Sequence, residues 1–153
     1  SFTSLRFFTV YGPGNRPDMM IHRLADSIVH GTQVELYDGG ENIYRDWTFV
    51  ADIVDGFVRA IDRPLGYEII NIGCGEPVEL CRFVDLLCEA AGARPMVVRA
   101  PRPATDAVCT HADITKARRL LGYEPVVSVP KGVRLFWEWY AANRSEQEAR
   151  RSG

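Results

Sequence analysis

The chain has 153 residues, of which 46% are hydrophobic and 25% are charged. This length suits one domain, and this composition favours a packed core over disorder. Its formal net charge is −2, from 18 basic and 20 acidic residues, whereas a nucleic-acid-binding protein would carry a basic stripe. No apolar run is long enough to span a membrane, so we expect neither nucleic acid nor a membrane as a partner.

The four cysteines, Cys74, Cys81, Cys88 and Cys109, form no CxxC pair and do not cluster in sequence with the histidines. Buried small hydrophobic side chains explain them better than a metal site does. Free cysteines are usual in a reducing compartment, and the first residues do not follow the plan of a signal peptide. We therefore expect a cytoplasmic protein.

Apolar residues from 5 to 11 do not alternate with polar ones, which is typical of a strand buried on both faces of a parallel sheet. Helical spacing then predicts a helix that ends at Gly31, with Asp18 as its N-cap. Residues 34–37 and 44–50 are expected to be extended, with turn-forming residues between them, as in a hairpin.

The remaining elements follow from the same periodicities. They are helices at 52–61, 79–91, from Asp113 to Leu121 and from Val129 onward, and strands at 67–72 and 96–99. After Asn143 the sequence turns polar, which predicts a frayed tail over residues 144–153. Two buried strands cannot complete a doubly wound sheet, so we interpret the chain as part of a larger fold.

The most specific motif is LRFFTVYGP at residues 5–13, followed by RPDM at residues 16–19. Further matches are YRDWTFVADI at 44–53, NIG at 71–73, AD at 112–113 and LGY at 121–123. In this order the motifs resemble the extended short-chain dehydrogenase/reductase family, specifically its nucleotide-sugar epimerases and dehydratases. The threonine after the aromatic pair, with RPDM downstream, is similar to UDP-glucuronate 4-epimerases. The resemblance covers residues 4 to 141, nearly the whole chain.

The resemblance implies an α/β fold that is incomplete in this chain. Residues 1–143 would form the carboxyl-terminal half, with 4–12 and 67–73 as strands of a Rossmann-type doubly wound sheet beside a small α/β substrate-binding domain. The family binds NAD with a GxxGxxG loop and takes its catalytic base from a Tyr-x-x-x-Lys pair, and neither occurs in this sequence. We expect a separate amino-terminal NAD-binding domain, a homodimeric parent, and a chain that is inactive alone and self-associates through exposed apolar surface.

The resemblance also implies a UDP-sugar ligand and positions for its nucleotide. Arg45 matches the family's phosphate-binding position, where a guanidinium can bind two oxygens at once. Tyr37 matches an aromatic beside the uracil, and Met20 and Ile21 begin a helix whose free N–H groups would lie near the nucleotide. Without the motif, Arg45 would be interpreted as a solvated cation and Tyr37 as a core aromatic.

Two further residues fall in the family's second phosphate and ribose region, Arg102 and Asp106. The sequence departs from the family pattern here, because Pro103 stands where relatives carry a basic or amide residue. Arg99 is the alternative to Arg102 for the phosphate contact. Phe7 matches the aromatic that packs near the nicotinamide, although a core phenylalanine would look identical.

Thr9 and Arg16 match the positions that hold the sugar carboxylate in UDP-glucuronate 4-epimerases. Oxidation at C4 of a glucuronate gives a ketone beta to a carboxylate, and such an acid loses carbon dioxide when the breaking bond aligns with the carbonyl π system. A hydroxyl and a bidentate arginine would hold the carboxylate out of that alignment. A strand threonine and a loop arginine that binds backbone carbonyls would be the structural interpretation.

The resemblance leaves several functions open. UDP-glucose 4-epimerase, dTDP-glucose 4,6-dehydratase and UDP-glucuronate decarboxylase belong to the same family. A nucleotide-binding module that has lost catalysis is an alternative of a different class. The upstream coding sequence would separate these classes.

Overall fold

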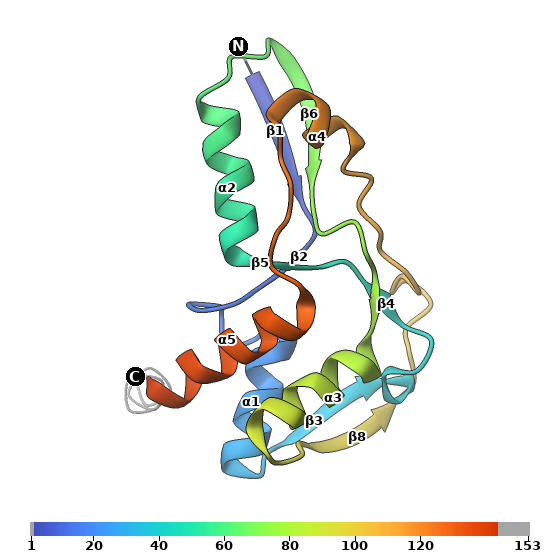
Figure 1. Ribbon diagram of the computed structural model, residues 1–153. Helices are drawn as coiled ribbons and strands as arrows, with labels where there is room; N and C mark the ends of the chain where they lie inside the picture. The colour runs from blue at the N-terminus through green and yellow to red at the C-terminus, as the bar shows by residue number, and fades with distance from the viewer. Residues whose placement is uncertain (1, 144–153) are drawn as a thin grey trace.

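The computed structural model describes residues 2–143 as two lobes joined by a short crossing of extended chain (Figure 1). Within this range the helices are α1 (Met20–His30), α2 (Val50–Ile61), α3 (Leu80–Ala91), α4 (Thr115–Leu121) and α5 (Val129–Ala142). Parallel strand pairs are β1 (Phe2–Phe7) with β6 (Tyr67–Ile72), β2 (Thr9–Tyr11) with β5 (Trp47–Phe49), and β3 (Gln33–Tyr37) with β8 (Met96–Ala100). β4 (Tyr44–Arg45) pairs antiparallel with β7 (Val78–Glu79), and a 3₁₀ turn covers Asp38–Gly40. The predicted polar tail, 144–153, lies outside the described residues.

The predicted strand at residues 5–11 is two strands rather than one. β1 pairs with β6 from Phe2 to Phe7, the chain bends at Phe8, and β2 pairs with β5. The prediction that this strand is buried on both faces is wrong for β1, because none of its residues is buried and Phe2 and Phe7 are exposed. Among the described strands, β1 also pairs with β6 alone.

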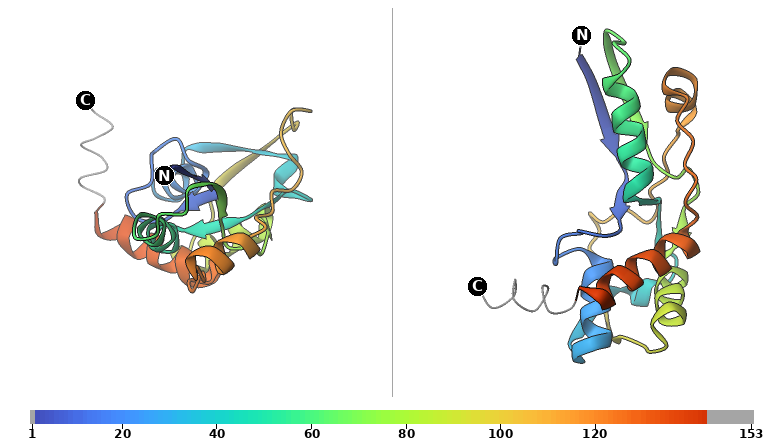
Figure 2. Two further views of the ribbon diagram at one scale, coloured as in Figure 1. Left: turned by 90° about the horizontal axis from the view of Figure 1, so that it is seen from above. Right: turned by 60° about the vertical axis from the view of Figure 1, so that its left-hand side comes forward.

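The first lobe contains β1, β6, α2 and α4, which pack around one apolar core. Its buried residues are Ile53, Ile70, Ile72, Ala112, Ile114, Ala117, Leu121 and Tyr123. Gly56 lets α2 approach the sheet closely, since a Cβ there would lie 3.0 Å from Cγ2 of Ile72. The right-hand view of Figure 2 shows α2 running alongside β1.

The second lobe contains α1, α3, α5 and the β3–β8 pair, and aromatic rings dominate its core. Trp47 stacks on Phe83 with centroids 3.9 Å apart, and Tyr11 meets both rings edge-on. The Tyr11 hydroxyl donates to the carbonyl of Val129 at 3.3 Å. Burial raises the pKa of Tyr11, so the hydroxyl is a donor at neutral pH and fixes β2 to the start of α5.

Two local predictions are wrong, and one holds with a small shift. Met19, not Asp18, is the N-cap of α1, and no side chain caps that end. Strands β3 and β4 form no hairpin, because β3 pairs with β8 and β4 with β7. Asp113 does accept the N–H of Thr115 at 2.9 Å, although α4 begins at Thr115.

The cysteines match their prediction only in part. Cys88 is buried, Cys74 and Cys81 are half-buried, and Cys109 is exposed, so the prediction is wrong for Cys109.

Among residues 2–143, no group of three or more histidine, cysteine or acidic side chains is placed to hold a metal ion. Within the same range, no helix combines the length and the apolar character that crossing a membrane requires.

The fully buried carboxylate of Asp46 joins the two lobes. It accepts backbone N–H groups from Cys74 at 2.7 Å, from Gly75 at 2.9 Å and from Ala112 at 3.0 Å. The Thr48 hydroxyl donates to it at 3.0 Å. A buried charge is costly unless hydrogen bonds satisfy it, and these four donors come from three separate chain segments. Asp46 therefore fixes where β4 and β5 lie relative to the first lobe.

We predict that Asp46→Ala destabilises the fold severely. The variant leaves three backbone N–H groups, one buried and two part-buried, without their acceptor, and the loss at a buried group costs about 1–3 kcal/mol. The free energy of unfolding in urea should fall by at least about 3 kcal/mol. The exposed Asp62 provides the control, and Asp62→Ala should change it by less than about 0.5 kcal/mol. Equal effects of the two variants would contradict the role of Asp46.

Candidate functional site

The end of β2 opens into two successive turns that form one wall of the site. Asn15 donates its N–H to the Gly12 carbonyl at 3.2 Å, and Gly14 between them has a φ of +76°. Proline before a glycine of positive φ is the pattern of a type II turn. In the next turn Met19 donates its N–H to the Arg16 carbonyl at 3.1 Å. The chain between β2 and α1 is thus held in a defined course.

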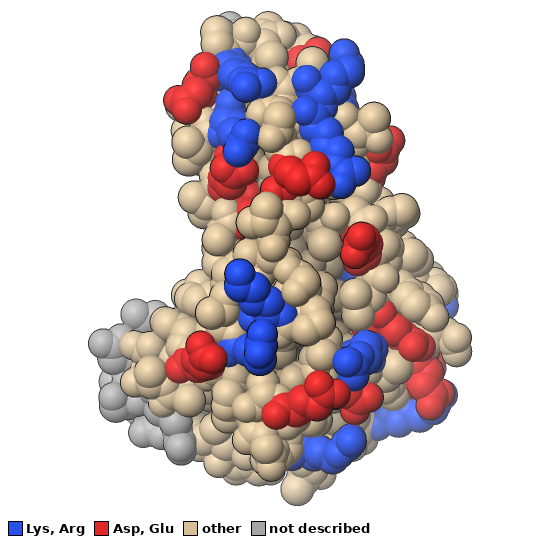
Figure 3. Space-filling view, viewed as in Figure 1, with Lys and Arg blue, Asp and Glu red and all other residues tan. Residues whose placement is uncertain are grey.

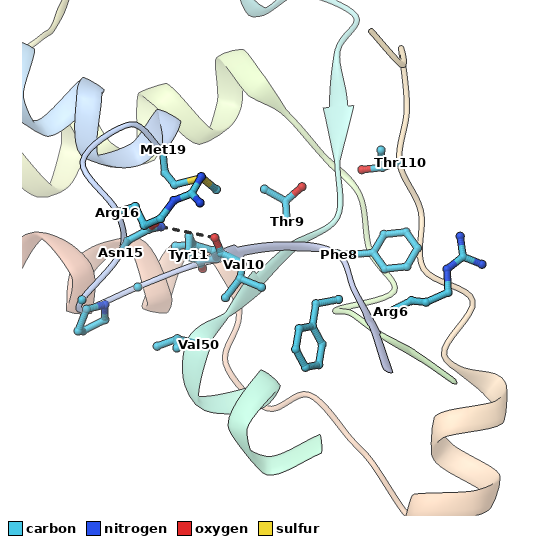
Figure 4. A pocket seen from close by; sticks show the side chains of 14 residues that line it. Arg6, Phe8, Thr9, Val10, Tyr11, Asn15, Arg16, Met19, Val50 and Thr110 are labelled. Carbon is cyan, nitrogen blue, oxygen red and sulfur yellow. Dashed lines mark hydrogen bonds between the residues drawn. The ribbon is translucent and has the colours of Figure 1, made fainter. Parts of the chain in front are cut away.

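A first hollow of about 800 Å³ lies between the end of β1, strand β2 and the two turns that follow β2 (Figure 4). Its lining residues are Arg6, Phe7, Phe8, Thr9, Val10, Tyr11, Gly12, Pro13, Gly14, Asn15, Arg16, Met19, Val50 and Thr110. Thr9 and Arg16, which the resemblance assigned to the sugar carboxylate, therefore line the same hollow. Phe7, assigned to the cofactor, lines it too.

A second hollow of about 220 Å³ adjoins the first. Its lining residues are Thr9, Val10, Tyr11, Asn15, Met19, Met20, Ile21, Tyr37, Ile43, Arg45, Trp47, Leu80 and Asp106. The residues assigned to the nucleotide, with the exception of Arg102, thus come together here. Thr9 lines both hollows, so the two groups of predicted residues meet at β2.

Arg16 is held by a neighbour in the turn rather than by backbone carbonyls. Its Nε and Nη2 donate to the carboxylate of Asp18 at 3.1 and 2.8 Å. Both side chains are largely exposed, 75% for Arg16 and 67% for Asp18, so this pair contributes little to stability. Figure 4 shows the Arg16 guanidinium and the Thr9 side chain on the same side of β2. The guanidinium keeps further N–H groups for a ligand.

Arg45 makes a more buried ion pair at the second hollow. Its Nη2 donates to Asp106 at 2.8 Å, and Nη1 donates to the carbonyls of Tyr44 at 2.9 Å and Val108 at 3.4 Å. The two side chains of the pair are 16% and 31% exposed. Arg45 is therefore fixed in direction before any ligand arrives, and the interpretation as a solvated cation is wrong.

Arg102 lies behind the second hollow and does not line it. Its Nη1 donates to the backbone carbonyls of Asp106 and Pro103, and its Nε lies 3.8 Å from an Asp38 oxygen. Arg99, the alternative phosphate ligand, pairs with Glu41 at 3.3 Å on the exposed surface. Neither arginine lines the first or the second hollow. Arg102 instead fastens the segment that carries Asp106.

Several residues that line both hollows were not singled out from the sequence. They are Val10, Tyr11, Asn15 and Met19. In the sequence, the one feature that could have pointed to Asn15 as a site residue is its position directly after Gly-Pro-Gly at the end of a strand. On the face of the molecule drawn in Figure 3, basic and acidic side chains are mixed, so that face carries no field of a single sign.

We predict that Arg45 and Asp106 are energetically coupled. In a double-mutant cycle with Arg45→Ala and Asp106→Ala, the coupling in the free energy of unfolding should be about 1 kcal/mol and should fall with added salt. Arg118 and Glu124 form an equally short pair, 2.8 Å, but are 52% and 61% exposed. Their coupling should be clearly smaller than that of Arg45 and Asp106, because solvent screens the pair. Equal coupling in both cycles would show that burial does not strengthen the Arg45 pair.

Comparison with known proteins found similar sequences and similar structures. Residues 1–73 match the family model of the NAD dependent epimerase/dehydratase family. The UDP-glucuronate 4-epimerase of Thermodesulfobacterium geofontis is 35% identical over 140 residues, which are 91% of this chain and 43% of that protein. Over nearly its whole length the chain is similar to proteins of the NAD dependent epimerase/dehydratase type.

Solved structures of the family superpose on the described fold. MoeE5 in complex with UDP-glucuronic acid and NAD has a TM-score of 0.86 at 36% identity, over 94% of this chain and 47% of that chain. The UDP-glucose 4-epimerase of Thermotoga maritima with UDP-glucose has a TM-score of 0.84 at 30% identity, over 93% and 46%. The predicted fold class, an incomplete Rossmann-type α/β fold, is confirmed. The chain spans less than half the length of these relatives.

Proposed function

We propose that this chain is the nucleotide-sugar-binding part of an NAD-dependent epimerase that inverts C4 of UDP-glucuronate. The observation that carries the proposal is that Thr9 lines two adjoining hollows, one with Arg16 and the other with Arg45. A nucleotide sugar has a diphosphate between its nucleoside and its sugar, so it needs two adjoining compartments with a cation for the phosphates. A uronate needs a second cation at the sugar.

The second hollow suits the UDP portion. Arg45 presents a guanidinium whose direction Asp106 and two carbonyls fix, which lowers the cost of ordering it around a diphosphate. Tyr37 is partly exposed at the end of β3, so one ring face is free to stack on uracil. Met20 and Ile21 supply an apolar wall at the start of α1, and Asp106 would accept hydroxyl groups of the ribose.

The first hollow suits the sugar. The Thr9 hydroxyl and the free edge of Arg16 would hold the carboxylate, and so prevent the alignment in which a 4-keto uronate loses carbon dioxide. Phe7 lines the same hollow and offers a flat apolar surface for a nicotinamide. NAD, when bound, supplies the hydride acceptor for C4. The residues present fit one face of that cofactor, and the pyrophosphate loop and the base would come from another part of the whole protein.

An apolar surface on the first lobe supports the existence of that other part. The large side chains exposed along β1, β6 and α2 are Phe2, Phe7, Val54, Phe57, Val58, Ile61, Tyr67 and Ile69. They lie on both sides of the β1–β6 pair, since side chains alternate along a strand, and we call these eight residues together the apolar face. The second edge of β1 beside it has unpaired backbone groups in the described structure, and exposed apolar patches with open edges mark interfaces. An NAD-binding domain that continues the sheet from β1 would cover both.

Removal of the Arg45 side chain should weaken UDP binding. Hydrogen bonds to charged groups are worth about 1.5–3 kcal/mol each, so Arg45→Ala should raise the Kd of UDP about 10- to 100-fold in isothermal titration calorimetry. The exposed Arg94, which pairs loosely with Asp85 at 3.6 Å, is the matched control, and Arg94→Ala should leave the Kd unchanged. UDP that binds Arg45→Ala as tightly as the unaltered chain would reject the proposed diphosphate site.

Arg16→Ala should change the choice of sugar. Its loss should weaken UDP-glucuronate about tenfold and leave UDP-glucose unchanged, because the uronate alone has a carboxylate for the guanidinium. Arg134, exposed on α5, serves as the control for a simple loss of positive charge. If Arg16→Ala weakens both sugars alike, the chain belongs with the UDP-glucose or dTDP-glucose enzymes of the family instead.

The apolar face should drive self-association of the purified chain. Phe57 and Ile61 are 49% and 65% exposed, so Phe57→Gln with Ile61→Gln should lower the mass measured by light scattering without lowering stability. Val126, 76% exposed but not part of the apolar face, is the control for a single apolar-to-polar change. A strictly monomeric chain that binds no hydrophobic dye would contradict the proposal that this face is an interface.

A further inference from the structure

Two polar side chains lie where the hollows meet and have capacity for a ligand. The residues common to both walls are Thr9, Val10, Tyr11, Asn15 and Met19. Val10 and Met19 are apolar, and the Tyr11 hydroxyl already donates to the Val129 carbonyl. Thr9 and Asn15 are therefore the side chains at the junction that can exchange hydrogen bonds with a bound molecule.

The backbone of Asn15 is held firmly. It occupies the last position of the Gly12–Asn15 turn, where its N–H donates to the Gly12 carbonyl. Pro13 restricts the backbone before it, and Pro17 restricts the next turn, which carries Arg16. The Cα of Asn15 is thus fixed relative to β2, and its half-buried side chain has few directions available.

The carboxamide of Asn15 is only partly used within the protein. Its Nδ2 donates to the Val10 carbonyl at 3.4 Å, which is at the long end for a hydrogen bond (Figure 4). A carboxamide has two N–H donors and an oxygen acceptor. One N–H and the oxygen therefore remain for a ligand, and this pairing of a donor with an acceptor suits a sugar hydroxyl.

We propose that Asn15 is a further sugar-binding residue, which hydrogen-bonds a pyranose hydroxyl close to the diphosphate. The inference rests on the proposed function, because it needs a nucleotide in the second hollow and its sugar in the first. A neutral carboxamide does not distinguish a carboxylate from a hydroxymethyl group on the far side of the ring. Asn15 thus recognises that a sugar is attached, whereas Arg16 recognises which sugar it is.

The test measures the Kd of UDP, UDP-glucose and UDP-glucuronate for the 153-residue chain and its variants. Asn15→Ala should weaken both sugar nucleotides about three- to tenfold, the worth of a neutral hydrogen bond, and should leave UDP unchanged. Asn15→Asp should weaken UDP-glucuronate more than UDP-glucose, because its added charge repels the carboxylate. Asn143, whose Nδ2 donates to the Trp139 carbonyl away from both hollows, is the matched control, and Asn143→Ala should change none of the three.

The unchanged affinity for UDP also reports that Asn15→Ala folds normally. Equal weakening of all three ligands would overturn the inference, because the residue would then act on the nucleotide or on the turn. Unchanged affinity for all three would overturn it as well. If the unaltered chain binds none of the ligands, the proposed function itself fails, and that result is distinct from a failure of Asn15 alone.

Discussion

The buried carboxylate of Asp46 is the constraint on which the rest of the structure depends. It lies between Arg45, on the wall of the second hollow, and Trp47, in the aromatic core. Its backbone N–H partners belong to the loop after β6 and to the segment before α4, both in the first lobe. One charge, desolvated but fully hydrogen-bonded, therefore fixes the crossing of the two lobes, and with it the direction in which Arg45 extends.

A second buried carboxylate completes this arrangement. Asp52, near the start of α2, accepts the N–H groups of Val126 and Val127, each at 3.1 Å. It thereby holds the segment that leads into α5, whose first turn receives the Tyr11 hydroxyl. β2 is consequently fixed at its pairing with β5 and at its end, so Thr9 lies at a defined point between the hollows. The helices and strands thus form a rigid frame, and side chains near their ends line the two hollows.

The sequence predicts the elements well where periodicity is strong, as in α1, α3 and α5, because helical spacing reflects one buried face. The prediction of a single strand at residues 5–11 is wrong, because a continuous apolar run does not show that the chain bends at Phe8 and pairs with β6 before the bend and with β5 after it. Motif resemblance singled out Thr9, Arg16 and Arg45, and the structure places all three in the walls of the two hollows. It did not single out Asn15, whose position depends on a turn geometry. Arg102, which it did single out, contacts Asp106, Pro103 and Asp38 and does not line either hollow.

The central claim is that the two hollows form one seat for a single nucleotide sugar. Titration of the chain with UDP-glucuronate, followed by amide NMR, tests it directly. The account predicts that the perturbed amides are those of Thr9 to Ile21 together with Tyr37, Arg45 and Asp106. UDP alone should perturb the subset around the second hollow. Perturbed amides confined to other surfaces would contradict it. So would UDP and UDP-glucuronate perturbing the same amides, because the sugar would then not reach the first hollow.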